Sequence, residues 1–133
     1  MTQEEKELLL NDLSARLPYG VKCQIQEDED TYIGTLCRIE IDNKNGHLLD
    51  FAETISGLDC QVYLSEIKPY IFPLSSMTEE QYIEYTDMGY SVTERWWSTA
   101  NYHQIEWLNK NHFDYRGLIE KGLALDATGL NIY

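Results

Sequence analysis

The sequence predicts an α+β fold: an N-terminal helix, an antiparallel meander of about four strands, and two or three C-terminal helices packed on one face of the sheet. Three observations predict it. Leucines recur at helical spacing near the N-terminus, apolar and polar residues alternate through the middle of the chain, and helical patterns rich in aromatic residues occupy the second half. The 133 residues fit one hydrophobic core, so residues 1–133 are expected to form a single globular domain.

The first helix is predicted from Gln3 to Arg16. The sequence Thr2-Gln-Glu-Glu5 has the form of a capping box, in which the Thr hydroxyl accepts a free amide and the Glu side chain reaches back. Pro18-Tyr19-Gly20 is expected to end the helix, because proline disfavours helix in the residue before it and glycine permits a sharp turn. The apolar face carries leucines at helical spacing, namely Leu9, Leu10, Leu13 and Leu17.

Two alternating segments follow and predict a hairpin. Residues Val21–Gln26 and Tyr32–Asp42 each place apolar side chains on one side, and the acidic run Glu27–Asp30 connects them as a solvated turn. If Gln26 pairs with Gly34, two cysteines face each other on the buried side. The side chains expected on that side are Val21, Cys23 and Ile25 from the first strand, and Ile33, Thr35, Cys37, Ile39 and Ile41 from the second.

A further turn and two strands complete the predicted meander. Asn43-Lys-Asn-Gly46 is a strong turn signal, because Asn-Gly readily takes positive φ at both central positions. It leads into a strand over about His47–Glu53, which Ser56-Gly57 ends, and a fourth strand is expected over Cys60–Tyr70. Pro69 lacks an amide donor, so this last strand is expected to lie at the sheet edge or to end there.

The second half of the chain reads as helical. Thr78-Glu-Glu-Gln81 is another capping box, and it opens a short helix to about Met88 that Gly89 closes. A longer helix is expected from about Thr93 to Asn111. The tail predicts a short helix or turn near Gly117–Leu123, followed by extended chain.

The charge balance limits the classes of partner. Lys and Arg number 10 against 23 Asp and Glu, which gives a net charge of −13. Gripping nucleic acid by its phosphates needs clustered cations, and adsorption to anionic lipid needs them too, so neither is expected. No apolar run approaches the roughly 20 residues that span a bilayer, and the acidic N-terminus lacks the basic start of a secretory signal. The expectation is a soluble, cytoplasmic protein with a basic protein partner.

Motifs for metal, nucleotide or hydrolytic chemistry are missing from the sequence, so no cofactor is expected. The three cysteines are odd in number and form no CxxC pair, which argues against a disulfide framework or a zinc site. A calcium loop starting at Asp28 fails, because Ile33 and Ile39 stand where it needs glycine and glutamate. No HExxH, GxSxG or phosphate-binding glycine loop occurs. An enzyme with an unrecognised site built from Cys60, His47 or His103 with a nearby acid stays an alternative.

Large aromatic rings are concentrated between residues 82 and 107. Most are expected in the core, since three tryptophans suffice to cover a small sheet. The adjacent Trp96 and Trp97 point about 100° apart on a helix, so both are hard to bury on one sheet. Because Trp and Tyr dominate interface hot spots, surplus rings favour a contact surface. The residues predicted to bind a partner are Trp96, Tyr102, Tyr85 and Tyr90.

Three stretches carry a family resemblance. The first runs from Glu4-Glu-Lys-Glu-Leu-Leu-Leu through Ala15-Arg-Leu-Pro-Tyr-Gly-Val-Lys-Cys23. The second begins Ile67-Lys-Pro-Tyr-Ile-Phe-Pro-Leu and ends at Glu80. The third begins Trp107-Leu-Asn-Lys-Asn-His-Phe-Asp-Tyr-Arg and ends at Leu125. Together they resemble a family of short uncharacterised proteins from gut bacteria and their phages or mobile elements. The resemblance implies a reducing, intracellular setting and an accessory role for a mobile element. It implies no activity, cofactor or catalytic residue.

These observations favour a small acidic protein that acts through protein–protein contact and not through catalysis. A sharper version, in which the protein imitates the charge of nucleic acid, needs a ridge of carboxylates. Residues 1–60 carry 13 acids against 5 bases and residues 61–133 carry 10 against 5, so the excess is spread along the chain and disfavours imitation. A small-molecule or glycan binder that uses exposed Trp96 and Tyr102 is the remaining alternative.

Overall fold

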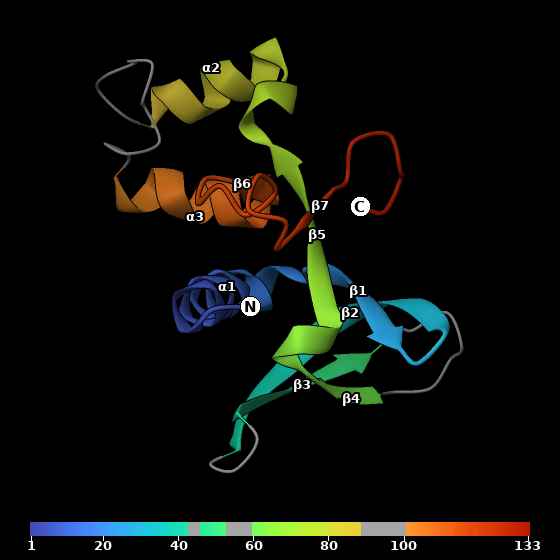
Figure 1. Cartoon of the computed structure of the whole chain (residues 1–133). Helices are drawn as coiled ribbons and strands as arrows, with labels where there is room; N and C mark the ends of the chain where they lie inside the picture. The colour runs from blue at the N-terminus through green and yellow to red at the C-terminus, as the bar shows by residue number, and fades with distance from the viewer. Residues whose placement is uncertain (43–45, 53–59, 89–100) are drawn as a thin grey trace.

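A helix precedes a mainly antiparallel sheet, and two more helices follow it, which confirms the α+β class (Figure 1). The computed structural model describes residues 1–42, 46–52, 60–88 and 101–133, without the side chains of residues 27, 41–48, 50–52 and 60. Over the described residues the sheet has seven strands, six of them in the order β4-β3-β2-β1-β5-β6, with β7 paired to β5.

Helix α1 spans Gln3–Arg16, as predicted. Both halves of the capping box form: the amide of Glu5 donates to Thr2 Oγ1 at 3.1 Å, and the amide of Thr2 donates to Glu5 Oε1 at 3.0 Å. Accepting that hydrogen bond lowers the pKa of the Glu5 carboxyl. A short 3-10 turn follows the helix, and Gly20 then takes a left-handed φ of 67°, so glycine ends this segment for the predicted reason.

The first hairpin forms, but with a different register from the predicted one. Strands β1 (Lys22–Glu27) and β2 (Asp30–Asp42) pair Cys23 with Gly34, not with Cys37. The two-residue turn explains the shift, because it holds Asp28 at a positive φ of 50° and sets Glu27 directly against Asp30. The shift is odd, so the opposite face of β2 is buried as far as a bulge between Leu36 and Arg38; beyond the bulge, Ile39 packs against the core as predicted. Leu36 is therefore in the core, while Cys37 is exposed.

The segment predicted as a fourth strand forms two separate strands, which lie at different positions in the strand order of the sheet. Strand β3 (Gly46–Ala52) pairs with β4 (Cys60–Tyr63), and a 3-10 turn then carries the chain across to β5 (Ile67–Pro73), which pairs with β1. The predicted antiparallel meander of four strands is confirmed over β1–β4, and only the bounds of its last strand are wrong, because residues 67–70 belong to β5. Pro69 lies inside β5 opposite Cys23 and does not end the strand. Residues 43–45 of the predicted turn and the strand end at 56–57 lie outside the described residues.

The second capping box also forms, and it opens α2 (Glu79–Asp87) as predicted. Helix α3 spans Tyr102–Lys110 and begins later than the predicted helix, because Asn101 caps it and Gln104 completes a third capping box. The segment over 93–100 lies outside the described residues. After α3 come two short strands, β6 (Phe113–Asp114) and β7 (Leu125–Asp126), both parallel to β5.

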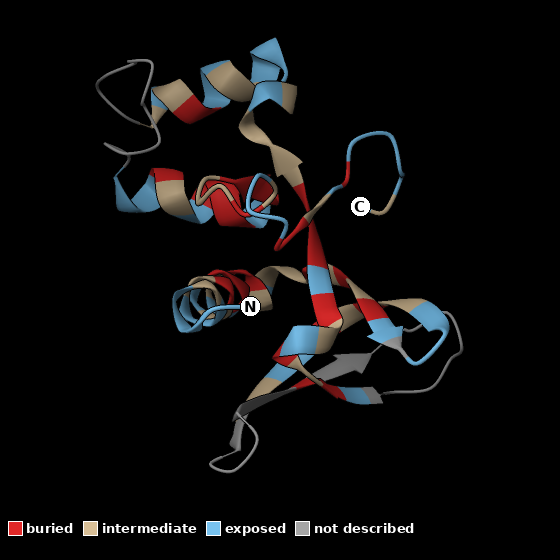
Figure 2. Cartoon of the chain, in the orientation of Figure 1, coloured by how far each residue is buried: buried red, intermediate tan, exposed pale blue. Residues whose placement is uncertain are grey.

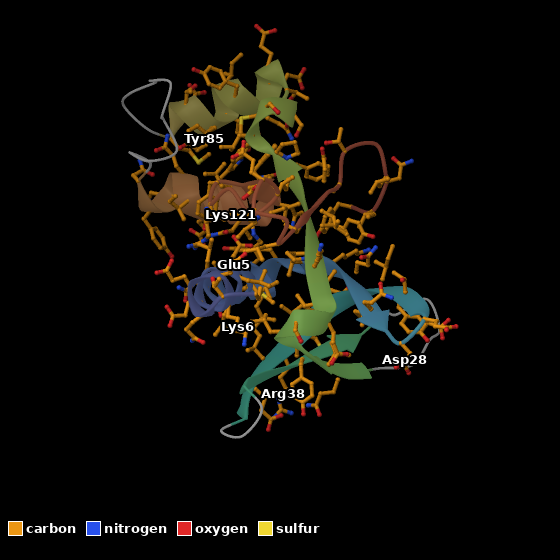
Figure 3. The ribbon with its side chains drawn as sticks, in the orientation of Figure 1. Glu5, Lys6, Asp28, Arg38, Tyr85 and Lys121 are labelled. Atoms are coloured by element: carbon orange, nitrogen blue, oxygen red, sulfur yellow. The ribbon has the colours of Figure 1, made fainter. Side chains whose placement is uncertain are left out.

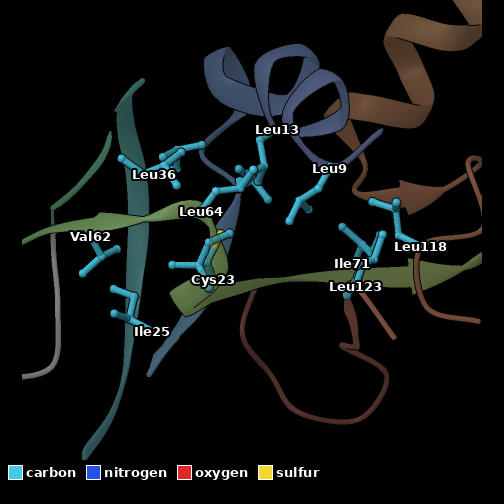
Figure 4. Packing of buried hydrophobic residues seen from close by; sticks show 14 residues of the cluster. Leu9, Leu13, Cys23, Ile25, Leu36, Val62, Leu64, Ile71, Leu118 and Leu123 are labelled. Carbon is cyan, nitrogen blue, oxygen red and sulfur yellow. The ribbon is translucent and has the colours of Figure 1, made fainter. Parts of the chain in front are cut away.

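The buried apolar residues form two clusters that meet along β5. The first cluster, drawn in Figure 4, joins Leu9 and Leu13 of α1 to the inner face of the sheet and to Leu118 and Leu123. The second lies at the far end of β5, where α2 and α3 enclose it. It consists of Tyr85, Trp107, Leu108 and Phe113. The C-terminal helices therefore pack on each other and on the end of β5, whereas α1 covers the sheet (Figure 2).

Candidate functional site

The four residues predicted to bind a partner lie in different environments. Tyr102 is the first residue of α3 and is 75% exposed, which suits a contact residue. Tyr85 is 1% exposed and belongs to the second cluster, so it is a core residue and not part of a surface. Trp96 and Tyr90 lie outside the described residues.

Tyr85 is buried because α2 directs its ring toward α3, as Figure 3 shows. The ring centres of Tyr85 and Trp107 lie 5.7 Å apart in an edge-to-face arrangement, and Trp107 in turn stacks on Phe113. Burial raises the pKa of Tyr85 to about 12. Trp107 is a core residue as predicted, but it packs in the second cluster beside Phe72 of β5, so the prediction that it covers the sheet face is wrong.

A small aromatic and acidic surface surrounds Tyr102; it consists of Tyr19, Tyr102, His103 and Glu106 and is called the Tyr102 face below. The ring centres of Tyr102 and His103 lie 5.7 Å apart, and Glu106 follows Tyr102 by one helical turn. Tyr19 donates its hydroxyl proton to Glu106 Oε1 at 3.0 Å, and this hydrogen bond raises the pKa of Tyr19. An exposed π-face beside a carboxylate suits a cationic side chain.

The start of α3 is held firmly, so the Tyr102 face has a defined position. Asn101 accepts the amide of Gln104 at 2.9 Å, and its Nδ2 donates to the carbonyl oxygen of Met88 at 2.6 Å. Gln104 donates to the carbonyl oxygen of Tyr85 at 3.2 Å. These bonds tie the first turn of α3 to the end of α2, and the capping-box pattern Asn101-Tyr-His-Gln104 is the sequence signal that locates them.

A buried ionic group lies between α1 and the segment after α3. Asp12 and Arg16 are both 0% exposed, and Arg16 Nε donates to Asp12 Oδ2 at 2.8 Å. Arg16 Nη2 also donates to the carbonyl oxygen of Phe113 at 2.6 Å, and Arg116 Nε lies 3.2 Å from Asp12 Oδ1. The spacing of Leu9, Asp12, Leu13 and Arg16 on one helix face is the signal that reveals this group in the sequence.

Tyr115 lies between the two arginines and completes the same cluster. The guanidinium carbons of Arg16 and Arg116 lie 5.5 and 4.9 Å from the centre of its ring. The Tyr115 hydroxyl accepts from Arg116 and donates to Asn109 Oδ1 at 2.9 Å. Both arginines are thus engaged with the protein, so the cluster serves to dock the C-terminal segment on α1.

His112 and Tyr133 form a stacked pair beside Lys22, the first residue of β1. Their ring centres are 3.7 Å apart with 14° between the planes. The Tyr133 hydroxyl accepts the amide of Lys22 at 2.8 Å and donates to the carbonyl oxygen of Tyr70 at 2.7 Å, so it bridges β1 and β5. Burial lowers the pKa of His112 to about 4, helped by the positive charge of Arg16, and raises the pKa of Tyr133.

The Cys and His residues considered for catalysis are not brought together in the described part of the chain. Cys60 pairs with Phe51, four residues from His47 on β3, which is roughly 13 Å along the strand. His103 is exposed on α3 and contacts Tyr102. Cys23 is fully buried, and burial raises the pKa of its thiol, which holds it in the unreactive protonated form.

The described residues contain no group of three His, Cys, Asp or Glu side chains placed to hold a metal ion. Within the same residues, every helix is too short or too polar to cross a membrane. Comparison of the chain with models of known protein families, with curated proteins and with solved structures gives no match.

Proposed function

We propose that the protein is a non-enzymatic binding module that recognises a basic protein through the Tyr102 face. The observation that carries the proposal is the 75% exposure of the Tyr102 ring, one helical turn from the carboxylate of Glu106. The Asn101 cap and the hydrogen bond from Tyr19 to Glu106 hold the two groups in place before a partner arrives. Preorganisation of this kind lowers the entropy lost on binding.

The chemistry of this face favours an arginine or lysine of the partner. A guanidinium placed over the exposed Tyr102 ring gains a cation–π contact, and the neighbouring Glu106 supplies a charge partner. The net charge of −13 attracts a basic protein over a longer range and raises its association rate. The proposal also places the protein in the reducing, intracellular setting that its family resemblance implies, as an accessory protein of a phage or mobile element.

Affinity purification with matched variants tests this proposal. The tagged full chain, Tyr102→Ala and Leu130→Ala are each used to capture proteins from the native cell, and the captured proteins are identified by mass spectrometry. Leu130 is the control because it is 53% exposed and lies far along the chain from α3. Neither substitution disturbs the core, since changes at exposed positions alter stability by only about 0.5 kcal/mol.

The expected result is a basic protein that the wild type and Leu130→Ala retain equally. Tyr102→Ala should lower its measured affinity about tenfold or more, as loss of an aromatic hot spot does. Raising the ionic strength from about 0.05 M to about 0.5 M should weaken binding, because charge attraction is then screened. Recovery of no partner at physiological salt would refute the proposal. So would a partner that Tyr102→Ala retains as well as the wild type does.

A further inference from the structure

A cavity of about 220 Å³ lies where the end of β5, the start of α2, the end of α3 and the loop after β7 meet. Two phenylalanine rings, Phe72 and Phe113, form its apolar side, and their centres are 6.1 Å apart. Gly129 and four uncharged polar side chains complete the lining; the polar ones are Ser76, Gln81, Asn111 and Thr128. None of its lining residues is charged, although a quarter of the chain is Asp, Glu, Lys or Arg.

Two amide side chains of the cavity, Gln81 and Asn111, are held by hydrogen bonds and retain unused hydrogen-bonding capacity. Gln81 accepts the amide of Thr78 with Oε1 at 2.9 Å, and Asn111 donates with Nδ2 to the carbonyl oxygen of Trp107 at 2.9 Å. Within the described part of the chain, Gln81 Nε2, Asn111 Oδ1 and the Thr128 hydroxyl have no protein partner. The lining side chains therefore carry a donor, an acceptor and a group that is both.

The apolar side is fixed equally well. Phe113 is 2% exposed and stacks on Trp107 at 5.7 Å with 14° between the planes. Phe72 donates its amide to the carbonyl oxygen of His112 at 2.7 Å, which holds the end of β5 against the segment after α3. Rigid walls with a few convergent polar groups are typical of small-molecule sites.

We infer that this cavity binds a neutral, hydroxyl-bearing ring of monosaccharide size. Phe72, which is half-buried, is the ring available to the C–H face of such a ligand, and Phe113 supports it from within the core. The ligand's hydroxyl groups both donate to Asn111 Oδ1 and accept from Gln81 Nε2. The volume lies below the roughly 300–1,000 Å³ of drug-sized pockets, which limits the ligand to a single ring. A charged ligand is disfavoured, because no lining residue would pair with its charge.

The cavity is separate from the Tyr102 face, so the two proposals stand or fall independently. Amide NMR spectra of the full chain are recorded while methyl glycosides of glucose, galactose and mannose are added in turn. At least one glycoside should give saturable shifts at the amides of Asn111, Thr128 and Gly129. The dissociation constant should be on the order of millimolar, as expected for a ligand of this size.

Gln81→Glu is the sharpest variant, because glutamate still completes the capping box of α2 but replaces the Nε2 donor with a negative oxygen. It should weaken glycoside binding about tenfold or more. Gln3→Glu adds the same charge at the exposed start of α1 and should leave binding unchanged. Thr128→Val removes a hydroxyl that makes no bond within the protein and should weaken binding severalfold.

Saturable shifts at the lining amides that Gln81→Glu and Thr128→Val both reduce would support the inference. It is overturned if none of the three glycosides shifts these amides, or if both variants bind as tightly as the wild type. Tyr102→Ala should bind the glycoside normally, which separates failure at this cavity from failure of the partner-binding face.

Discussion

Removing the charge of Asp12 while keeping its shape should strongly destabilise the fold. In Asp12→Asn, Arg16 loses its anionic partner at 2.8 Å while its side chain stays fully buried. Breaking a buried ion pair in this way costs about 3–5 kcal/mol. Arg116 is affected less, because its side chain is 27% exposed and water screens its charge. The expected loss is a large part of a total stability of about 5–15 kcal/mol.

Urea unfolding followed by circular dichroism at pH 7 measures this loss through linear extrapolation. The matched control is Glu40→Gln, which removes the exposed 3.6 Å pair with Arg38 and should change the free energy of unfolding by less than about 1 kcal/mol. The double variant Asp12→Leu/Arg16→Met removes both buried charges and should be more stable than Asp12→Asn. The reasoning is refuted if Asp12→Asn loses no more stability than Glu40→Gln.

Three further predictions concern single side chains. Thr78→Ala removes the cap of α2 and should cost about 1 kcal/mol in thermal unfolding, whereas an unchanged melting temperature would show that the cap is dispensable. Tyr133→Phe leaves the amide of Lys22 without its acceptor and should cost about 1–2 kcal/mol in urea, while equal stability would rule out the bridge. The pKa of His112 is about 4 in the folded protein and about 6.5 in the unfolded chain. The folded protein therefore holds His112 neutral, and this contribution to the free energy of unfolding is fully present above pH 6.5. It is lost as the pH falls toward 4, by up to about 3 kcal/mol. His112→Asn tolerates the positive φ of 62° and should lose less stability than the wild type between about pH 7 and pH 4; identical pH dependence would contradict this.

Local signals in the sequence were sufficient for the helix starts. Thr2 and Thr78 each cap a helix whose first residue is where the capping box puts it, because the bonds involved lie within four residues. The same logic applies at Asn101, whose capping box with Gln104 starts α3 at Tyr102 and not at the predicted Thr93. Helix ends are thus readable from short sequence patterns.

Strand pairing depended on information that alternation does not contain. Alternation allows either face of β2 to be the buried one, and the turn at Asp28 selects the face that carries Leu36. The crossing from β4 to β5 follows a 3-10 turn at Leu64–Glu66 that has no glycine or proline to mark it. Without that break, residues 60–70 read as one strand.

The candidate site was only partly accessible from the sequence. Residue type alone points to Tyr102; the structure shows that its side chain is exposed, and its role in binding stays a prediction. The prediction for Tyr85 is wrong, because helical phase within an aromatic-rich segment does not say which side of the helix meets the core. The cavity beside Phe72 joins four segments far apart in the chain, so no spacing rule could find it.

Strand β5 contributes residues to both apolar clusters, and this determines how the protein unfolds. Ile67 and Ile71 enter the cluster beneath α1, while Phe72 packs against the cluster between α2 and α3. Melting either cluster removes a neighbour of the same strand, so the two halves should lose their amide protection in one cooperative event. Hydrogen exchange would then detect a single folding unit rather than a sheet and a helical pair that open independently.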